Sequence, residues 1–180
     1  MSDGIDVTDV TDVTDGNRTP VPADPLALAG AEHTLRLEAR LIDHNQFNEW
    51  LALYTADATY WLPLEAGQTD PLETSSIVYD DYTLLKVRVK QYSETRAHAR
   101  RPAARTVHQV GNVLILGAHE DELEVASTLV VVEYRQERQR VWGANVVHRL
   151  RRTAAGLRIA AKRVDLVNSE SELDGIAILF

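Results

Sequence analysis

The chain has 180 residues, of which 44% are hydrophobic and 26% are charged, and it contains no cysteine. A globule of this size buries roughly 70% of the surface of its unfolded chain, so it can fold without disulfides or metal. The lack of cysteine excludes disulfides, thiolate metal sites and iron–sulfur clusters held by this chain.

The negative charge is concentrated near the N-terminus. The formal net charge is −8, and residues 1–25 hold six aspartates against Arg18, which gives that segment −5 and leaves −3 for the rest. The segment repeats Asp-Val-Thr and has no large apolar side chain, so we expect a disordered acidic tail over residues 1–24 and one folded domain over 25–180. A signal peptide and an apolar stretch of the roughly 20 residues that span a membrane are both missing, and we therefore expect a cytoplasmic protein.

Two amphipathic helices are expected at the start of the domain. Asp24 can cap a helix whose first turn contains Pro25, and apolar residues then recur every three or four positions over residues 25–43. That apolar stripe consists of Leu28, Ala31, Leu35, Ala39 and Ile42. After His44, a shorter helix is expected with Asn45 as its N-cap.

The rest of the domain is expected to be mostly strand. Residues 58–64 and 75–79 favour a strand pair, and Asp80 and Asp81 should cap a third helix that reaches about Tyr92. Four further strand-like runs follow at hairpin spacing, at about 106–117, 123–135, 139–152 and 157–167. Their short links permit only antiparallel neighbours. Leu129 to Val132 is apolar on both faces, which predicts a strand in mid-sheet with cover on each side.

This order of elements predicts an α+β fold. Three helices would pack on one face of a strongly curved, mixed or antiparallel sheet and form a cone. The inside of such a cone is a natural pocket for a small molecule.

The histidines do not suggest a metal site. The six of them are His33, His44, His98, His108, His119 and His148. None forms a short ligand motif with another, so we expect no metal in this chain.

His108 and His148 nevertheless lie inside predicted strands. Alternation places His108 on one face with Thr106, Val110 and Asn112, and His148 on one face with Trp142, Ala144 and Val146. If both faces line the cone, the imidazoles would meet Tyr60 or Asp43, an arrangement suited to general acid–base catalysis. The favoured alternative is structural histidines, hydrogen-bonded to a neighbouring strand or a partner chain, because no carboxylate partner is evident.

A basic stretch runs from Lys86 to Arg105, with seven basic residues against Glu94 alone. The chain as a whole is acidic and no aromatic stacking platform is interleaved, so nucleic-acid binding is not expected. A surface for a partner protein or a solvated helix fits better.

The last residues of the sequence are unusually apolar. Ile176 to Phe180 contains only Ile, Ala, Leu and Phe. Such a run must be covered, either by its own sheet or by another subunit. We take Ile176, Ile178, Leu179 and Phe180 as candidate subunit-interface residues.

Taken together, several segments resemble a known family in order and spacing. They are residues 38–43, 49–54, 57–63, 77–81, 105–113 and 156–166. The chain resembles the β (small) subunit of aromatic-ring-hydroxylating dioxygenases over about residues 26–180. These subunits have the cone-shaped fold of nuclear transport factor 2, ketosteroid isomerase and scytalone dehydratase.

The resemblance implies a non-catalytic subunit without a cofactor, which supports assembly of an α3β3 oxygenase with β–β contacts in a trimer. A large α subunit would hold a Rieske [2Fe-2S] cluster and mononuclear Fe(II), and would dihydroxylate an aromatic ring in aromatic-compound catabolism. Electrons from NAD(P)H would reach it through a separate reductase and ferredoxin, and neither nucleic acid nor membrane is an expected partner. Two alternatives remain: a stand-alone dehydratase or isomerase that uses His108, His148, Tyr60 and Asp43, and a ligand-binding or adaptor module.

Overall fold

The computed structural model describes residues 19–22, 24–98, 104–171, 176 and 178–180. Most of the expected acidic tail lies outside these residues. From its described part, the Val21 amide donates a hydrogen bond of 3.0 Å to the carbonyl oxygen of Ile115.

The helices and strands follow one another in the expected order. They are α1 (Pro25–Asp43), α2 (Phe47–Leu51), β1 (Tyr54–Pro63), β2 (Ser76–Asp81), α3 (Tyr82–His98), β3 (Arg105–His119), β4 (Glu122–Arg135), β5 (Arg138–Thr153) and β6 (Gly156–Leu166). The strands form one sheet in the order β2-β1-β6-β5-β4-β3. All neighbours are antiparallel except β1 and β6, which run parallel.

Aspartate side chains cap the beginnings of α1 and α3. The Asp24 carboxylate accepts a hydrogen bond from the Leu26 amide at 3.2 Å, as the sequence predicts. Asp81 does the same for the Leu84 amide at 2.8 Å. The prediction for α2 is wrong at its cap, because Gln46 stands at the N-cap. Asn45 instead has φ 59°, a conformation that asparagine tolerates better than most residues.

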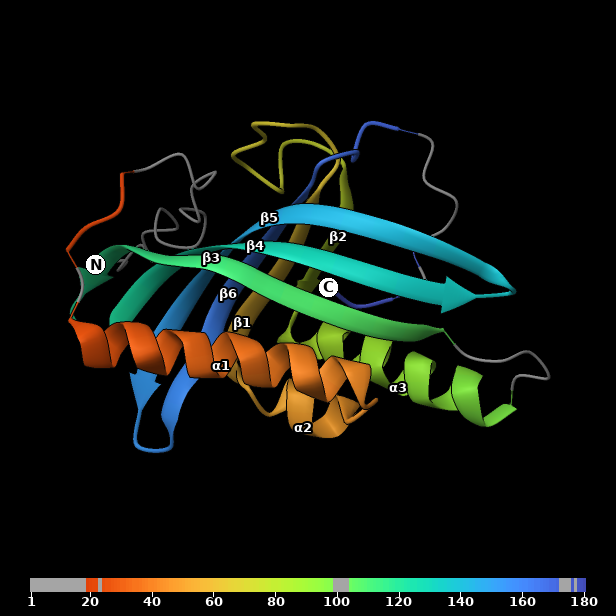
Figure 1. The fold of residues 1–180 in the computed structure, drawn as a ribbon, viewed down its shortest axis with the longest axis horizontal. Coiled ribbons are helices and arrows are strands. Elements are labelled where there is room, and N and C mark those ends of the chain that lie inside the picture. Colours follow the sequence, from red (N-terminus) through yellow and green to blue (C-terminus); the bar gives the residue numbers. More distant parts are fainter. Residues whose placement is uncertain (1–18, 23, 99–103, 172–175, 177) are drawn as a thin grey trace, which may run out of the picture.

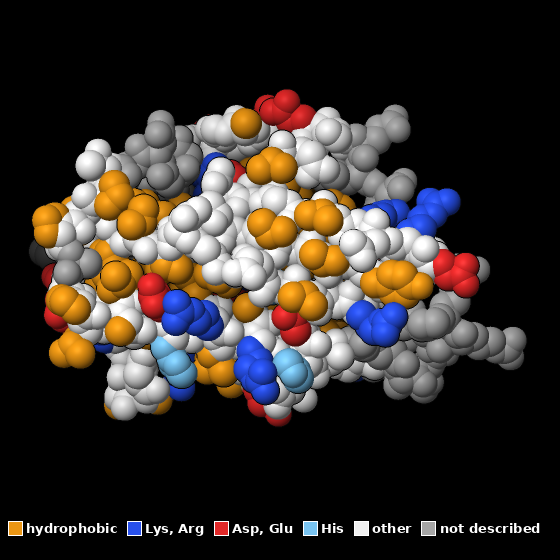
Figure 2. Space-filling view, in the orientation of Figure 1, with side chains coloured by type: hydrophobic (Ala, Val, Ile, Leu, Met, Phe, Trp, Pro, Cys, Tyr) orange, Lys and Arg blue, Asp and Glu red, His pale blue; other side chains and the backbone are white. Residues whose placement is uncertain are grey.

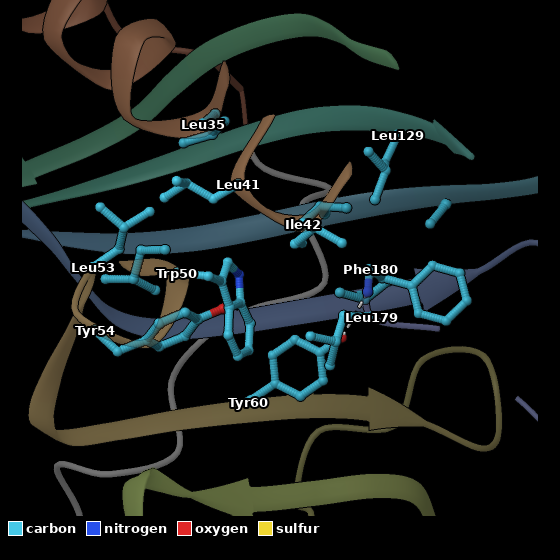
Figure 3. Packing of buried hydrophobic residues seen from close by; sticks show 14 of the residues in the cluster. Leu35, Leu41, Ile42, Trp50, Leu53, Tyr54, Tyr60, Leu129, Leu179 and Phe180 are labelled. Atoms are coloured by element: carbon cyan, nitrogen blue, oxygen red, sulfur yellow. Dashed lines mark hydrogen bonds between the residues drawn. The ribbon is translucent and has the colours of Figure 1, made fainter. Parts of the chain in front are cut away.

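The three helices lie on one face of the curved sheet, and the core lies between the two layers (Figure 1). Trp50 of α2 contacts two tyrosines of β1 edge-on, Tyr54 with centroids 4.9 Å apart and Tyr60 at 6.3 Å. Figure 3 shows Trp50 between the two tyrosines and close to Ile42 of α1, with Phe180 joined to Tyr60 by a hydrogen bond. Each large apolar side chain buried here stabilises the fold by about 1.5–3 kcal/mol.

The outer face of the sheet differs from one sequence prediction. Leu129 and Val131 point inward and are buried, but Val130 is exposed on the outer face and the neighbouring Val132 is only partly buried. The expected cover on both sides of β4 is therefore absent among the described residues.

Strand alternation also fails at Asn112. The β3 register shifts between Gly111 and Leu114, and Asn112 adopts φ 50° in this bulge. Its side chain donates to Thr128 Oγ1 at 3.1 Å. Because a bulge adds a residue to one strand, Asn112 does not share the inner face with His108.

Candidate functional site

A buried carboxylate, Glu38 of α1, lies at the centre of the cone interior. Trp50 Nε1 and Tyr54 Oη donate hydrogen bonds to its Oε1 at 3.2 and 2.8 Å. Lys162 Nζ of β6 lies 2.8 Å from the same oxygen, and His148 Nε2 of β5 lies 3.1 Å from Oε2. Four donors from four elements therefore converge on one carboxylate.

The pKa values of this cluster follow from burial and charge. Burial opposes ionisation of Glu38, but the Lys162 ammonium and the bond from His148 outweigh it and hold the pKa of Glu38 well below its ordinary value. Burial also lowers the pKa of Lys162, and Glu38 offsets only part of this. The net result is a paired buried charge, which the hydrogen bonds to Glu38 make tolerable.

His148 is neutral in this arrangement. Burial lowers its pKa below 6.5, and the Glu38 contacts counteract this only in part. Because a carboxylate only accepts hydrogen bonds, Nε2 carries the proton and Nδ1 is an acceptor. Nδ1 is buried and has no hydrogen-bond partner among the described residues.

Asp43 and His108 form a second pair. His108 Nδ1 lies 2.6 Å from Asp43 Oδ1, and the His108 amide donates to Oδ2 at 3.0 Å. Thr106 Oγ1 donates to the same carboxylate at 3.0 Å. Burial opposes ionisation of Asp43, but the bonds from His108 and Thr106 outweigh it and lower its pKa. The carboxylate thus satisfies an edge amide of β3, which a sheet edge would otherwise leave open.

The C-terminal segment occupies the remaining interior. The Phe180 amide donates to Tyr60 Oη at 3.1 Å (Figure 3). Lys162 Nζ donates to the Phe180 oxygen at 2.6 Å. His108 Nε2 lies 3.0 Å from the Leu179 carbonyl oxygen. The space left between α1, the sheet and Phe180 is about 10 Å³, room for roughly one water molecule.

Part of this site is predictable from the sequence. Asp43 and His108 meet as expected, whereas His148 contacts Glu38 and Tyr60 contacts Phe180. Both nitrogens of His108 face acceptors, Asp43 and Leu179, so neither is available to a substrate. Glu38 and Lys162 were missed. The available signal for Glu38 was its position within the apolar stripe, three residues after Leu35.

The candidate interface residues are covered by their own chain. Ile178, Leu179 and Phe180 are buried in the core of their own chain, and Ile176 packs against it partly buried. The sequence left open whether this apolar run is covered by its own chain or by another subunit. In the structure, the sheet and helices of the same chain cover it. Contact of this segment with another subunit stays a prediction.

The described residues do not suit iron. In the parts of the chain that the structure describes, no three His, Cys, Asp or Glu side chains converge as ligands. Asp43 and His108 contribute one carboxylate and one imidazole, which is short of the donor set that non-haem iron requires. In the same residues, no helix is long and apolar enough to cross a membrane.

Comparison with known proteins gives the family. The sequence profile described as "Ring hydroxylating beta subunit" matches residues 37–171. This chain belongs to that family. The small oxygenase component of the p-cumate 2,3-dioxygenase system of Pseudomonas putida is 36% identical, over 73% of this chain and 74% of its own length. The biphenyl 2,3-dioxygenase subunit beta of Rhodococcus jostii is 29% identical, over 86% and 88% of the two chains.

The fold of this chain is also similar to solved structures of ring-hydroxylating dioxygenases. The β subunit of benzoate 1,2-dioxygenase from Burkholderia mallei superposes with a TM-score of 0.72 at 26% identity, covering 88% of this chain and 99% of its own. A chain of naphthalene 1,2-dioxygenase gives 0.73 at 18% identity, covering 88% of each, which shows the shared fold. Catalysis in such oxygenase systems lies in the α subunit.

Proposed function

We propose that this chain is the non-catalytic small subunit of an oxygenase that dihydroxylates an aromatic ring, and that it stabilises the assembly of the large catalytic subunit. The family match over most of the domain carries this proposal. The interior supports it, because the side chains that could act as acids or bases are engaged with one another and with Leu179 and Phe180.

The finer composition of the complex is part of the proposal. We infer an α3β3 oxygenase in which β subunits also contact one another. The large subunit would hold a Rieske cluster and a mononuclear iron, and a ferredoxin and reductase would deliver electrons from NAD(P)H to it. The cytoplasm, where those reductants are supplied, is the proposed compartment.

We further propose that the outer face of β3, β4 and β5 contacts the large subunit. Among the residues that the structure describes, no helix covers this face, and Figure 2 shows apolar side chains gathered over it. Val107, Val132 and Val141 are register neighbours across the three strands, and Val107 and Val141 are 63% and 64% exposed. Exposed apolar patches of this kind mark interaction sites.

The basic residues beside this row favour the large subunit over a second copy. Arg105, Arg135 and Arg138 are exposed at the same end of the sheet, with Glu137 in the hairpin between the last two. A two-fold contact would set the face against itself, where little acidic surface is available. An acidic surface on the large subunit would be complementary in charge.

Co-expression with a large subunit of the family tests the proposed function. We expect the two chains to co-purify as one complex by size-exclusion chromatography, with iron in the complex and less than about a tenth of an iron per chain in the small subunit alone. Ring dihydroxylation should need the large subunit. Stoichiometric iron in the isolated chain, lost when one or two of its histidines are replaced, would contradict the proposal.

His108→Asn distinguishes this function from that of a cone-fold dehydratase. Loss of an imidazole general base lowers turnover by about 10²–10⁴-fold. Because both nitrogens of His108 are engaged in structure, we expect turnover per assembled complex to change less than a few-fold. His119→Asn, on the exposed end of β3, is the matched control.

A further inference from the structure

The main chain of Leu179 and Phe180 is held by polar side chains rather than by secondary structure. Residues 178–180 belong to no helix or strand. Tyr60, Lys162 and His108, from three different strands, provide the contacts of 3.1, 2.6 and 3.0 Å to this segment. Tyr60 and Lys162 are buried, and so is the side chain of His108. Fixed, buried groups that converge on a carbonyl-bearing segment are typical of a ligand site.

The Phe180 ring fills the apolar part of the same space. It contacts Trp142 edge-on, with ring centroids 5.7 Å apart and planes at 80°. Phe180 is 1% exposed, and Figure 3 shows its ring pointing away from Tyr60, with Leu129 above it. Aromatic pairs favour this geometry, so the position selects for a planar ring.

A second, independent observation points to a ligand. His148 lines the same cavity as Phe180, and its buried Nδ1 is an acceptor without a partner among the described residues. Buried polar atoms are normally satisfied, and an exception indicates a site for a group that the protein does not itself supply. A hydroxyl on a bound molecule, or a water, would fit there.

We propose that the interior of the cone is a binding site for a small aromatic molecule with a carboxylate or carbonyl group, which Leu179 and Phe180 occupy as an intramolecular ligand. The ring of such a molecule would replace the Phe180 side chain beside Trp142, and its carboxylate would replace the Phe180 oxygen at Lys162. This site is separate from any chemistry of the large subunit and does not rest on the proposed function.

Leu179 and Phe180 compete with a bound molecule for this site. A tethered segment acts at an effective concentration on the order of millimolar for a short linker, so weak ligands are excluded from the intact chain. Removal of the segment should therefore reveal binding.

The probe is 3-phenylpropionate, measured by calorimetry and by the rise in melting temperature. We expect it to bind a chain that lacks Leu179 and Phe180 at least tenfold more tightly than the unaltered chain. We expect 3-phenyl-1-propanol, which has the same ring but no carboxylate, to bind the shortened chain at least fivefold more weakly than 3-phenylpropionate.

Phe47→Ala is the matched control, because Phe47 is the other phenylalanine of the sequence and is also buried. It packs on Tyr92 with centroids 5.8 Å apart, and it does not line the cavity that Phe180 shares with Lys162 and His108. Its removal opens a comparable space without these polar groups, and 3-phenylpropionate should not bind there. Equal binding to both variants, or none to a folded shortened chain, would overturn the proposal.

Folding of the variants is followed by circular dichroism. If the shortened chain is unfolded, Phe180→Ala in the full chain takes its place, and 3-phenylpropionate should restore its melting transition toward that of the unaltered chain. If neither variant folds with the probe present, Phe180 is an essential part of the core and the assignment of a ligand site is wrong.

Discussion

Glu38 is the residue on which the buried charges of the cone depend. Its removal would take away the carboxylate that pairs with the Lys162 ammonium at 2.8 Å and would leave the Phe180 oxygen as the hydrogen-bond acceptor of Lys162 among the described residues. Breaking a buried pair costs about 3–5 kcal/mol, because an uncompensated charge stays behind. We expect Glu38→Ala to lower the free energy of unfolding by that amount in urea denaturation.

Glu32→Ala on the same helix is the control. Glu32 pairs with Arg36 at 2.9 Å on the surface, and exposed pairs are worth about 0–1 kcal/mol. If the two substitutions cost the same, the buried cluster does not contribute as we infer.

His148 should make stability depend on pH near neutrality. Because its folded pKa is lowered below 6.5, the unfolded state takes up a proton first as the pH falls. Stability is therefore fully present above pH 6.5 and declines below it, by at most about 1.4 kcal/mol per pH unit. Urea denaturation between pH 8 and 5 should show this decline, and His148→Gln should flatten it. Parallel curves would mean that His148 does not titrate differently in the two states.

Of the contacts between individual residues, the sequence predicted the one between Asp43 and His108 but not the cluster around Glu38. Asp43 and His108 could be paired because strand alternation turns His108 toward the helices, and a carboxylate ends the first of them. The pairing of Glu38 with Lys162 could not be predicted, because it depends on β6 lying against α1, from which it is far away in the sequence. A charge in an apolar stripe indicates a buried partner but does not say which one.

In the hairpin between β4 and β5, two residues adopt a backbone conformation that is unfavourable for their side chains. Arg135 pairs with Arg138, so Gln136 and Glu137 alone form the turn, and both have positive φ, 50° and 61°. Two-residue turns of this kind favour Asn-Gly. We expect Glu137→Gly to stabilise the protein by about 0.5–1 kcal/mol, because glycine adopts this region without steric cost.

Gly156 gives the reverse test. Its φ is +96°, and a Cβ there would meet no atom within 4 Å, so Gly156→Ala isolates the backbone cost. It should destabilise by about 1 kcal/mol or more. Thermal unfolding of both variants provides the measurement, and a destabilising Glu137→Gly would show that the turn is not strained.

The positions of most helices and strands could be predicted from the sequence, but the order of the strands in the sheet could be predicted only in part. The helix over 25–43 and the meander of β3 to β6 are confirmed, because they follow from local caps, periodicity and short links. The parallel pairing of β1 with β6, and the hydrogen bond of 2.8 Å from the Ile159 amide to the Leu53 oxygen, join segments about a hundred residues apart. No local pattern specifies such a pairing.

For the molecule as a whole, one face of the sheet is covered by helices and the other carries the apolar row of Val107, Val132 and Val141 (Figures 1 and 2). The inner face is held together by the buried cluster and the C-terminal segment, so the fold does not need a partner to close it. We therefore expect substitutions on the outer face to weaken association with a partner without unfolding the chain.

Val141→Asp tests this separation between folding and assembly. A carboxylate at the centre of a packed interface commonly costs 2 kcal/mol or more, about a thirtyfold loss of association. Because Val141 is 64% exposed in the isolated chain, we expect its circular dichroism and melting temperature to change little. Leu26→Asp is the control, since Leu26 is 81% exposed in the first turn of α1, away from this face. Sedimentation with the large subunit should show a weakened complex for Val141→Asp and an intact one for Leu26→Asp. If both chains assemble normally, the large subunit contacts another surface; if only association between small subunits is lost, the face joins copies of this chain instead.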